Sequence, residues 1–527
     1  MIEKLMTNMS EPGPAEVKPA QTGNIRREVG DDGICVLTFD RAGSAANIFD
    51  RATLEELNEH LNFLDRSSGI KGIVVTSAKK NIFIAGADLN ALGSIRGPAE
   101  LTEYITLGQE VFGRLEALGV PTVAAIHGAC VGGGYEICLA CNYRVASPDK
   151  VTKIGLPETQ LGILPAWGGS TRLPRLIGLP KALDIILGGK TVAAKQALRL
   201  GMVDQLAPKE YLVDVARKLI LSKGKRLRKR PFSFVNLALN NHLAGRILAK
   251  RLLPKVLLKT RGHYPAIPKA LEVITEGVGT SVGKSLALER QAILDLAKSE
   301  ACQNLIRIFL MQERAKKHPG IAGSEHASAA KSIKRAAVIG AGVMGSGIAQ
   351  WTSAKEISVI LRDINKEMVA KGMAGISKLY EQGVKRHSFT KVEARAGLDR
   401  VSPTTAEVPL KNVDLVIEAA VEKMNLKKEI FRKLDERAGL ETILATNTSA
   451  LSVTELAGAT SHPERVVGIH FFNPVHKMQL VEVIVAKQTS PDVTRRAVKY
   501  VQQIGKLPVV VKDSPGFLVN RILMPYL

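Results

Sequence analysis

The sequence is poor in aromatic residues and cysteine, and it has no long apolar run. Aromatic residues make up 4% of its 527 residues, and its five cysteines are an odd number. This cysteine usage argues against a disulfide framework and is typical of a reducing compartment. No run approaches the roughly 20 apolar residues that span a bilayer. Residues 1–23 lack the apolar core of a signal peptide, so we expect a disordered tail there.

Acidic residues are too few to balance the basic ones. The chain has 73 Lys and Arg against 50 Asp and Glu, a net charge of +23 and a pI of about 9.7. Such an excess suits nucleic acid, an anionic membrane surface, or a polyphosphorylated substrate such as coenzyme A. The densest basic run, Lys223–Arg230, lacks interleaved aromatic residues, and no nucleic-acid-binding motif accompanies it. Nucleic acid is therefore the least favoured partner, while peripheral membrane association stays open.

Two stretches of alternating strand-like and helix-like segments flank a helical middle. A chain of this length predicts two or three domains. The alternation covers residues 24–222 and 332–527, which predicts two α/β domains. Residues 223–331 are basic and helix-like and end in a stretch rich in Pro, Gly, Ala and Ser, so we expect a helical linker there.

A glycine fingerprint opens the second α/β stretch. The apolar run Ala336–Ile339 leads into Gly340, Gly342 and Gly345, spaced G-x-G-x-x-G, and a helix is expected over Ile348–Lys355. In a dinucleotide-binding turn the first glycine permits the tight turn, the second admits a pyrophosphate, and the third allows close helix packing. N–H groups at the helix start then bind the phosphate charge. This predicts a doubly wound, NAD-binding sheet.

An acidic residue supports that prediction. Asp363 follows the strand-like run Ser358–Leu361, about twenty residues beyond the fingerprint, where a carboxylate binds the ribose hydroxyls of NAD. The neighbouring Arg362 is the one feature that keeps NADP open. The predicted cofactor contacts are Gly340, Gly342, Val343, Met344, Gly345 and Asp363.

Two bare turns in the first stretch could polarise a carbonyl group. Ala85-Gly86-Ala87 and Gly132–Gly134 each follow an apolar strand-like segment. If they face each other, two backbone N–H groups can bind one oxygen, and one such donor is worth about 10²–10³ in rate. Glu136 and Glu158 each lie beside a special turn and could share acid and base work. Alternatively the glycines serve packing, Glu136 complements a helix dipole, and Glu158 is a loop charge.

Three motifs carry a family resemblance over residues 24–222. They are F-I-A-G-A-D-L (Phe83–Leu89), H-G-A-C-V-G-G-G-Y-E (His127–Glu136) and G-L-P-E-T-Q-L-G-I-L-P-A-W-G-G-S-T-R-L (Gly155–Leu173). Together they resemble the crotonase (enoyl-CoA hydratase) superfamily, which implies a spiral ββα fold. The resemblance assigns the oxyanion-binding N–H groups to Ala87 and Gly133 and the catalytic glutamates to Glu136 and Glu158. Further substrate contacts are expected from Ala85, Gly86, Asp88 and Gly134.

The implied reaction is the syn hydration of a trans-2-enoyl-CoA to an L-3-hydroxyacyl-CoA. We assign water activation to Glu136 and delivery of the C2 proton to Glu158. Proton shuttling at the same site would give a Δ3–Δ2-enoyl-CoA isomerase activity as well.

His470 ends an apolar strand-like run in the second stretch. The carboxyl ends of strands in a doubly wound sheet are where ligands bind. A carboxylate partner would fix the tautomer of the imidazole and raise its basicity, as a general base requires. Glu482 and Glu418 both lie in apolar strand-like runs, so the residues alone do not choose the partner.

H-F-F-N-P (His470–Pro474), L-V-E-V-I (Leu480–Ile484) and K-D-S-P-G-F (Lys512–Phe517) resemble the L-3-hydroxyacyl-CoA dehydrogenases over residues 334–527. The resemblance implies that His470 is the base and Glu482 its orienting partner. It assigns Ser449 and Asn473 to the catalytic network around the substrate hydroxyl and Asn520 to the cleft. Glu422, Lys423 and Asn447 are then cofactor contacts.

A hydratase followed by this dehydrogenase is similar to the multifunctional β-oxidation enzymes, among them the alpha subunit of the bacterial fatty-acid oxidation complex. That similarity implies NAD as cofactor, coenzyme A thioesters as substrates and no metal. It also implies a thiolase beta subunit or a homo-oligomer as partner, and a bacterial cytoplasmic location, with the mitochondrial matrix as the alternative. The sequence stops at Asn520–Leu527, where the family's helical C-terminal domain begins, so we expect an incomplete dehydrogenase half.

Two alternatives remain at this point. One is an active hydratase with a non-catalytic NAD-binding module. The other is a basic interaction protein without catalysis.

Overall fold

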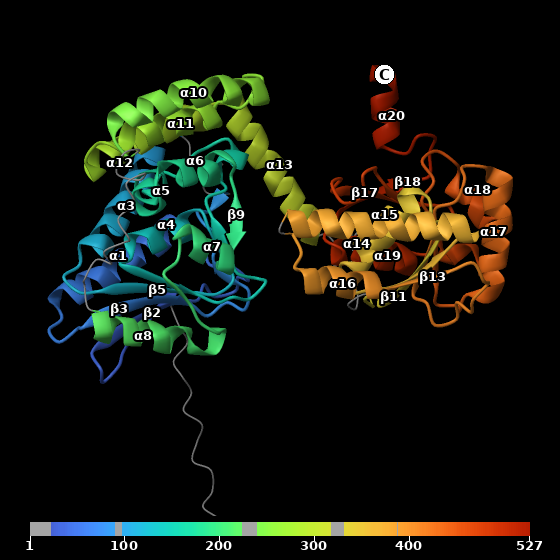
Figure 1. Ribbon diagram of the computed structural model, residues 1–527, viewed down its shortest axis with the longest axis horizontal. Coiled ribbons are helices and arrows are strands. Elements are labelled where there is room, and N and C mark those ends of the chain that lie inside the picture. Colours follow the sequence, from blue (N-terminus) through green and yellow to red (C-terminus); the bar gives the residue numbers. More distant parts are fainter. Residues whose placement is uncertain (1–22, 90–96, 224–239, 318–330, 387) are drawn as a thin grey trace, which may run out of the picture. The chain divides into compact units, whose positions relative to one another are not determined.

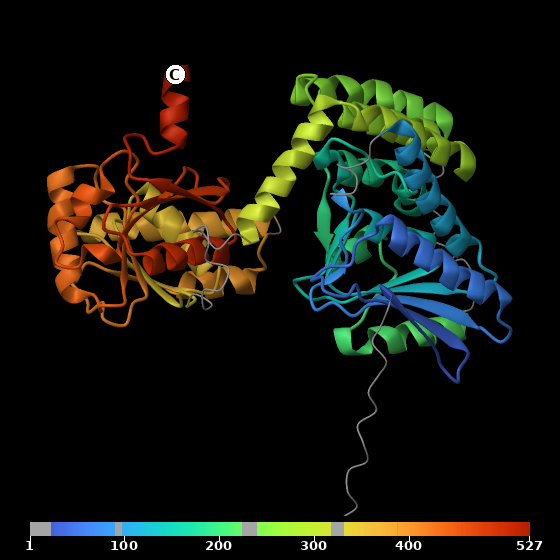
Figure 2. The same ribbon diagram turned by 180° about the vertical axis from the view of Figure 1, so that it is seen from behind.

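The computed structural model describes residues 23–89, 97–223, 240–317, 331–386 and 388–527 (Figures 1 and 2). The chain divides into two compact units, Met1–Phe309 and Leu310–Leu527. The predicted tail, apart from residue 23, and most of the basic run at 223–230 lie outside the described residues.

Two sheets form the first unit. The larger sheet has the strand order β1-β2-β3-β5-β7-β10, and the smaller has the order β4-β6-β8-β9. Neighbouring strands are parallel except β1 with β2 and β8 with β9. The strands are β1 Ile25–Val29, β2 Ile34–Phe39, β3 Gly72–Ser77, β4 Ile82–Ile84, β5 Thr122–Ile126, β6 Ala129–Val131, β7 Tyr143–Ala146, β8 Lys153–Gly155, β9 Thr191–Ala193 and β10 Gln205–Leu206.

Helices cover these sheets. They are α1 Arg51–Arg66, α3 Pro98–Ala117, α4 Gly133–Ala140, the 3-10 helix η1 Glu158–Leu161, α5 Gly169–Ile177, α6 Leu179–Leu187, α7 Ala194–Leu200, the 3-10 helix η2 Lys209–Tyr211 and α8 Leu212–Lys223. Helix α1 shows how the sequence specifies them. Asp50 caps its first turn by accepting from the Thr53 N–H at 2.8 Å, worth about 1 kcal/mol. Its leucines recur at helical spacing and are buried, as the pattern predicted.

Four further helices follow, α10 His242–Thr260, α11 Ala266–Gly277, α12 Val282–Ala297 and α13 Glu300–Lys317. Lys298 and Ser299 separate α12 from α13. Arg175 of α5 donates to the Gly277 carbonyl at 2.8 Å, and Gln109 of α3 donates to the Leu286 carbonyl at 2.9 Å. The helices expected in a linker therefore pack on the first unit as far as Phe309.

The second unit is a doubly wound sheet with the strand order β13-β12-β11-β14-β15-β16-β17-β18. Each neighbouring pair is parallel except β16 with β17. The strands are β11 Arg335–Ile339, β12 Ser358–Arg362, β13 Val401–Thr404, β14 Leu415–Glu418, β15 Ile443–Thr446, β16 Val466–Phe471, β17 Leu480–Val485 and β18 Leu507–Lys512. The predicted fold class is confirmed.

Helices lie on both faces of this sheet (Figure 1). They are α14 Val343–Ser353, α15 Lys366–Lys385, α16 Lys391–Asp399, α17 Met424–Arg437, α18 Val453–Ala457, the 3-10 helix η3 Pro463–Arg465, α19 Pro491–Gln503, α20 Val519–Leu523 and the 3-10 helix η4 Met524–Tyr526. Helix α14 begins five residues before the expected start at Ile348, so it contains the third glycine of the fingerprint.

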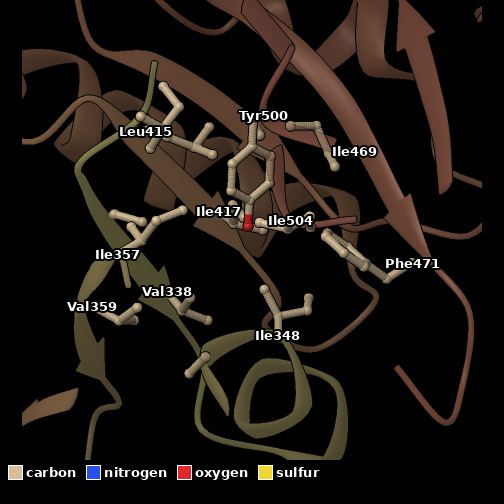
Figure 3. Close-up of a cluster of buried hydrophobic side chains, with 14 of the residues drawn as sticks. Val338, Ile348, Ile357, Val359, Leu415, Ile417, Ile469, Phe471, Tyr500 and Ile504 are labelled. Carbon is tan, nitrogen blue, oxygen red and sulfur yellow. The ribbon is translucent and has the colours of Figure 1, made fainter. Parts of the chain in front are cut away.

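Alternate residues of the central strands enter two separate cores. Val338 of β11 packs in one core, while its neighbours Ala337 and Ile339 pack in the other. Figure 3 shows the first core, with the Tyr500 ring among aliphatic side chains. The Tyr500 hydroxyl pairs with the Thr352 hydroxyl at 2.7 Å, so the aromatic ring is buried without an unpaired polar group.

All five cysteines are free and buried, as expected without a disulfide framework. Cys138 lies nearest to Cys130 rather than to its sequence neighbour Cys141, with the two sulfur atoms 3.6 Å apart. No helix within the described ranges is long and apolar enough to cross a membrane.

Candidate active sites

The two glycine turns of the first unit face each other. A Cβ added to Gly86 would lie 3.6 Å from the Gly133 nitrogen. Both turns need glycine, because φ is +104° at Gly86 and +57° at Gly132. The sequence therefore brings two bare backbone segments to one place, as predicted.

The N–H groups of Ala87 and Gly133, the candidate oxyanion donors, both point away from the backbone segments that carry them. Phe49 donates its N–H to the Gly86 carbonyl and accepts from the Asp88 N–H, each near 2.9 Å. Successive N–H groups in extended backbone point to opposite sides, so the Ala87 N–H points away from Phe49. Gly133 is the first residue of α4, where an N–H has no acceptor within the helix.

The scarce aromatic residues gather around this glycine turn. Phe49, Tyr104 and Phe112 each pack edge-on against Trp167, with ring centroids 5.3–5.9 Å apart. A Cβ added to Gly133 would lie 2.7 Å from the Trp167 ring. Rigid rings thus fix the backbone that carries the Gly133 N–H and exclude water from it.

Glu136 lies in the first turn of α4 and is buried. Its Oε1 accepts from the Trp167 and Gly169 N–H groups, both at 2.8 Å. Burial raises the pKa of Glu136 to about 7, while the two N–H donors and the Arg172 charge oppose the shift. A carboxyl group with a pKa near neutrality is suited to act as a general base.

Glu158 begins η1 and lies in a contrasting environment. Both of its carboxyl oxygens are buried, and neither has a hydrogen-bond partner among the described residues. Its Oε1 lies 3.2 Å from the position of a Cβ added to Gly132, so the carboxyl group borders the glycine turn. Burial, and then the charges of Glu136 and Glu289, raise the pKa of Glu158 well above its usual range. This shift favours the protonated form of Glu158, which is the form that can act as an acid.

Glu289 of α12 is a third buried carboxyl group in this cluster, and the sequence analysis missed it. Its Oε2 accepts from the Gly168 N–H at 2.8 Å. The available signal was its position in the apolar stripe of a helix, between Ser285 and Ala292, where a carboxylate needs a partner.

The glycine fingerprint of the second unit has the backbone that a dinucleotide turn needs. Gly340 has φ of +107°, and a Cβ at Gly345 would lie 1.8 Å from the Gly340 carbonyl oxygen. Gly342 caps α14 and would leave a Cβ in open space. Val343 and Met344 follow it in the first turn of α14, where N–H groups have no acceptor within the helix.

A cavity of about 490 Å³ lies beside this turn and is lined by Gly340, Gly342 and Asp363. Asp363 holds the loop, because its Oδ2 accepts from the Ala341 N–H at 2.6 Å. Arg362, the residue that kept NADP open, is paired with Glu407 at 3.1 Å. The glycine turn, the cavity and the carboxylate fit NAD.

His470 and Glu482 are directly opposite each other on the antiparallel strands β16 and β17. The Nδ1 atom of His470 lies 2.7 Å from Glu482 Oε2. Glu482 Oε1 accepts from the Leu518 and Val519 N–H groups, both at 2.9 Å. Burial raises the pKa of Glu482, but these three hydrogen bonds outweigh it and leave the pKa below its usual value. Nε2 is then the His470 nitrogen that can take a proton from a substrate.

Glu418, the other carboxylate considered for His470, has a different partner. It is buried against Lys427, whose Nζ lies 2.7 and 2.9 Å from its two carboxylate oxygens. Lys427 also lies 3.3 Å from Glu422. Burial raises the pKa of Glu422, but bonds from Thr448 and the nearby Lys427 charge lower it overall. The buried Lys427 thus joins Glu418 and Glu422. Lys423, which we predicted as a cofactor contact, is exposed.

The remaining predicted residues lie close together at the carboxyl ends of the strands. The Ser449 N–H donates to Glu422 Oε1 at 2.9 Å, and the Ser449 carbonyl accepts from Asn520 at 3.0 Å. Asn447 accepts from the Phe471 N–H at 2.9 Å, one residue after His470. Asn473 is exposed and precedes a cis proline. Within the part of the chain that the structure describes, no group of His, Cys, Asp and Glu could hold a metal ion.

Comparisons with known proteins match both units. The family Enoyl-CoA hydratase/isomerase matches residues 30–244, and the family 3-hydroxyacyl-CoA dehydrogenase, NAD binding domain, matches residues 335–514. A solved 3-hydroxybutyryl-CoA dehydrogenase from Escherichia coli is 39% identical over 37% of this chain and 42% of that chain, with a TM-score of 0.37.

Longer relatives cover both units in one alignment. The fatty acid oxidation complex subunit alpha of Shewanella loihica is 40% identical over 500 residues, which are 94% of this chain and 70% of that protein. The Shewanella baltica subunit is 39% identical over 511 residues, 96% of this chain and 71% of that protein. The predicted resemblance is confirmed: the chain belongs to the family of fatty acid oxidation complex alpha subunits, with a hydratase domain followed by a dehydrogenase NAD-binding domain.

Proposed function

We propose that the five residues Ala87, Gly133, Glu136, Glu158 and His470 carry the two reactions of this fatty acid oxidation enzyme. The first unit adds water to a trans-2-enoyl-CoA. The second oxidises the resulting L-3-hydroxyacyl-CoA to a 3-ketoacyl-CoA with NAD. The product of the first reaction is the substrate of the second, which gives a reason for both domains in one chain.

Hydration begins with the thioester carbonyl between the Ala87 and Gly133 N–H groups, which stabilise the negative charge that develops on its oxygen. Ionised Glu136 takes a proton from water as the water oxygen bonds to C3. Protonated Glu158 gives its proton to C2. The Glu136 charge raises the pKa of Glu158, so the two carboxyl groups are near each other. Both additions then occur from one face, which is a syn addition.

In the second unit, His470 Nε2 takes the proton of the 3-hydroxyl group. NAD, when bound, accepts the hydride from C3. Glu482 holds the His470 ring in the tautomer that leaves Nε2 free of a proton, and it stabilises the imidazolium that forms. Ser449, Asn473 and Asn520 contact the substrate around this base.

The observation that carries the proposal is the buried carboxyl group of Glu158, which has no partner among the described residues yet borders the turn of the oxyanion donors. A purely structural carboxyl group would have a hydrogen-bond partner in such a place. Its two free oxygens fit a group that acts on substrate.

The test follows the loss of the ultraviolet absorbance of crotonyl-CoA. We expect Glu158→Gln to lower kcat for hydration by about 10²–10⁴, the usual contribution of a general acid. The exposed Glu55→Gln on α1 is the matched control and should hydrate like the wild-type protein. Unchanged hydration by Glu158→Gln would overturn the two-glutamate mechanism.

Glu158 also suits a second activity, Δ3–Δ2-enoyl-CoA isomerisation, in which its ionised carboxylate takes a proton from C2 and then returns that proton to C4. A 3-enoyl-CoA should then give the conjugated 2-enoyl-CoA in water. Loss of this conversion in Glu158→Gln, but not in Glu55→Gln, is the expected result.

The proposal also covers the protein's partners and its location in the cell. A thiolase beta subunit would consume the 3-ketoacyl-CoA, and the expected site of the whole sequence is the bacterial cytoplasm. The excess positive charge serves the acidic coenzyme A substrates and leaves room for contact with an anionic membrane surface. Light scattering of the purified chain would show whether it self-associates.

A further inference from the structure

Three successive backbone N–H groups of one turn are shared between two buried carboxyl groups. The Trp167 and Gly169 N–H groups donate to Glu136, and the Gly168 N–H between them donates to Glu289, all at 2.8 Å. Gly168 has φ of +106°, and this left-handed residue turns its N–H toward the opposite side from its neighbours. The turn that positions Glu136 is therefore held from its other side by Glu289.

Glu289 is not explained by helix packing alone. It is fully buried on the inner face of α12, and its Oε1 has no hydrogen-bond partner among the described residues. Helix α12 is already fixed to the body by Thr171 with Ser285 at 2.8 Å and by Gln109 with the Leu286 carbonyl at 2.9 Å. A carboxyl group with an unpaired oxygen at this depth lowers stability unless it has another use.

We propose that Glu289 is a positioning residue of the hydratase site, which fixes the Trp167–Gly169 turn and, once ionised, holds the proton on Glu158 through its negative charge. This inference rests on the proposed hydratase function and extends it to α12. Glu289 does not touch the reacting atoms. It acts through the backbone under Glu136 and through its charge on Glu158.

Electrostatics supports this role. Burial, followed by the Glu136 charge, raises the pKa of Glu289 to about 8, and Glu289 is in turn among the charges that raise the pKa of Glu158. Three buried carboxyl groups cannot all be ionised together, and the repulsion between any two is reciprocal.

Among the described residues, the three arginines near these carboxyl groups form hydrogen bonds with other partners. Arg172 of α5 binds Glu116 of α3 at 2.9 Å and the Trp167 carbonyl at 3.0 Å. Arg175 of α5 is directed to the Thr171, Gly277 and Thr280 carbonyls. Arg290 of α12 donates to Gln109. The facing titratable and charged groups are thus Glu136, Glu158, Glu116, Arg172, Arg175 and Arg290.

Two substitutions of Glu289 separate its effect on the position of the Trp167–Gly169 turn from the effect of its charge. Glu289→Gln keeps an oxygen to accept from the Gly168 N–H but removes the negative charge. Glu289→Asp keeps the charge but shortens its reach by one carbon. Asp295→Asn, an exposed carboxylate on the same helix, is the matched control.

The measurement is kcat for crotonyl-CoA hydration as a function of pH. Removing this negative charge lowers the pKa of Glu158, so the basic limb of the Glu289→Gln profile, where Glu158 loses its proton, should move to lower pH by about half a unit or more. Glu289→Asp should keep its limbs and lose about tenfold or more in kcat, because a displacement near 1 Å is costly in a positioned site. Asp295→Asn should match the wild-type profile.

The fold of Glu289→Gln is checked by its near-ultraviolet circular dichroism. If the folded variant has the same basic limb in its pH profile as the wild-type protein, the inference is overturned and the proposed function stands. If Glu289→Gln does not fold, wild-type kcat in Glu289→Asp would overturn it instead. Absence of hydration by the wild-type protein would overturn the proposed function and this inference with it.

Discussion

Glu158 of the first unit and Glu482 of the second are both buried carboxyl groups, but their surroundings differ. Glu158 has no hydrogen-bond partner among the described residues, and its neighbours are other carboxyl groups. Glu482 has three hydrogen-bond donors, one of them His470. The pKa of Glu158 is raised and that of Glu482 is lowered. These opposite shifts suit the proposed roles, in which Glu158 delivers a proton and Glu482 keeps a charge that orients a base.

The largest effect we expect in the second unit is the loss of its base. His470→Gln should lower the rate of acetoacetyl-CoA-dependent NADH oxidation by about 10²–10⁴, because the amide cannot exchange the proton that the imidazole Nε2 exchanges with the substrate. Crotonyl-CoA hydration in the same preparation is the internal control and should be unchanged. An unchanged dehydrogenase rate would remove His470 from the mechanism.

Substituting the partner of that base should cost less. Glu482→Gln removes the charge that stabilises the imidazolium, and we expect the dehydrogenase rate to fall by about 10²-fold, a loss within the range of general acid–base contributions. Hydration should again be unaffected. A loss of NAD affinity equal to the loss of rate would contradict the assignment, because it would make Glu482 a binding residue.

A smaller effect is expected on NAD binding by the second unit. In Gly345→Ala the new Cβ would meet the Gly340 carbonyl oxygen, so the turn must shift. We expect NAD affinity, measured by fluorescence titration, to fall about tenfold, and the second unit to lose about 1–3 kcal/mol. Gly375→Ala in α15 has open space and should be neutral or slightly stabilising. Equal NAD affinity in both variants would contradict the role of this glycine.

The strands of the second unit could be predicted closely, because parallel strands buried on both faces are continuous apolar runs. The apolar runs Ile443–Thr446 and Leu480–Val485 form β15 and β17. Short strands lack such runs, among them β13, where Val401 is followed by Ser402 and Pro403.

Site residues that belong to a compact motif could also be read from the sequence. Glu136 and Glu158 follow glycine-rich motifs in the sequence, and in the structure the Glu136 carboxyl group lies at the Trp167–Gly169 turn and the Glu158 carboxyl group at Gly132. The register between β16 and β17 places Glu482, and not Glu418, opposite His470. No local sequence pattern could predict this pairing. Glu289 was missed because its carboxylate reaches the site from a helix 121 residues beyond Gly168.

The most direct test of the comparison is made in the first unit, by measuring the pH dependence of kcat for crotonyl-CoA hydration. Glu136 must be ionised to act as base, and burial raises its pKa to about 7. The rate should therefore fall as the pH drops through about 7. A profile that stays flat down to about pH 5 and falls only near the ordinary glutamate pKa of about 4.3 would contradict the account.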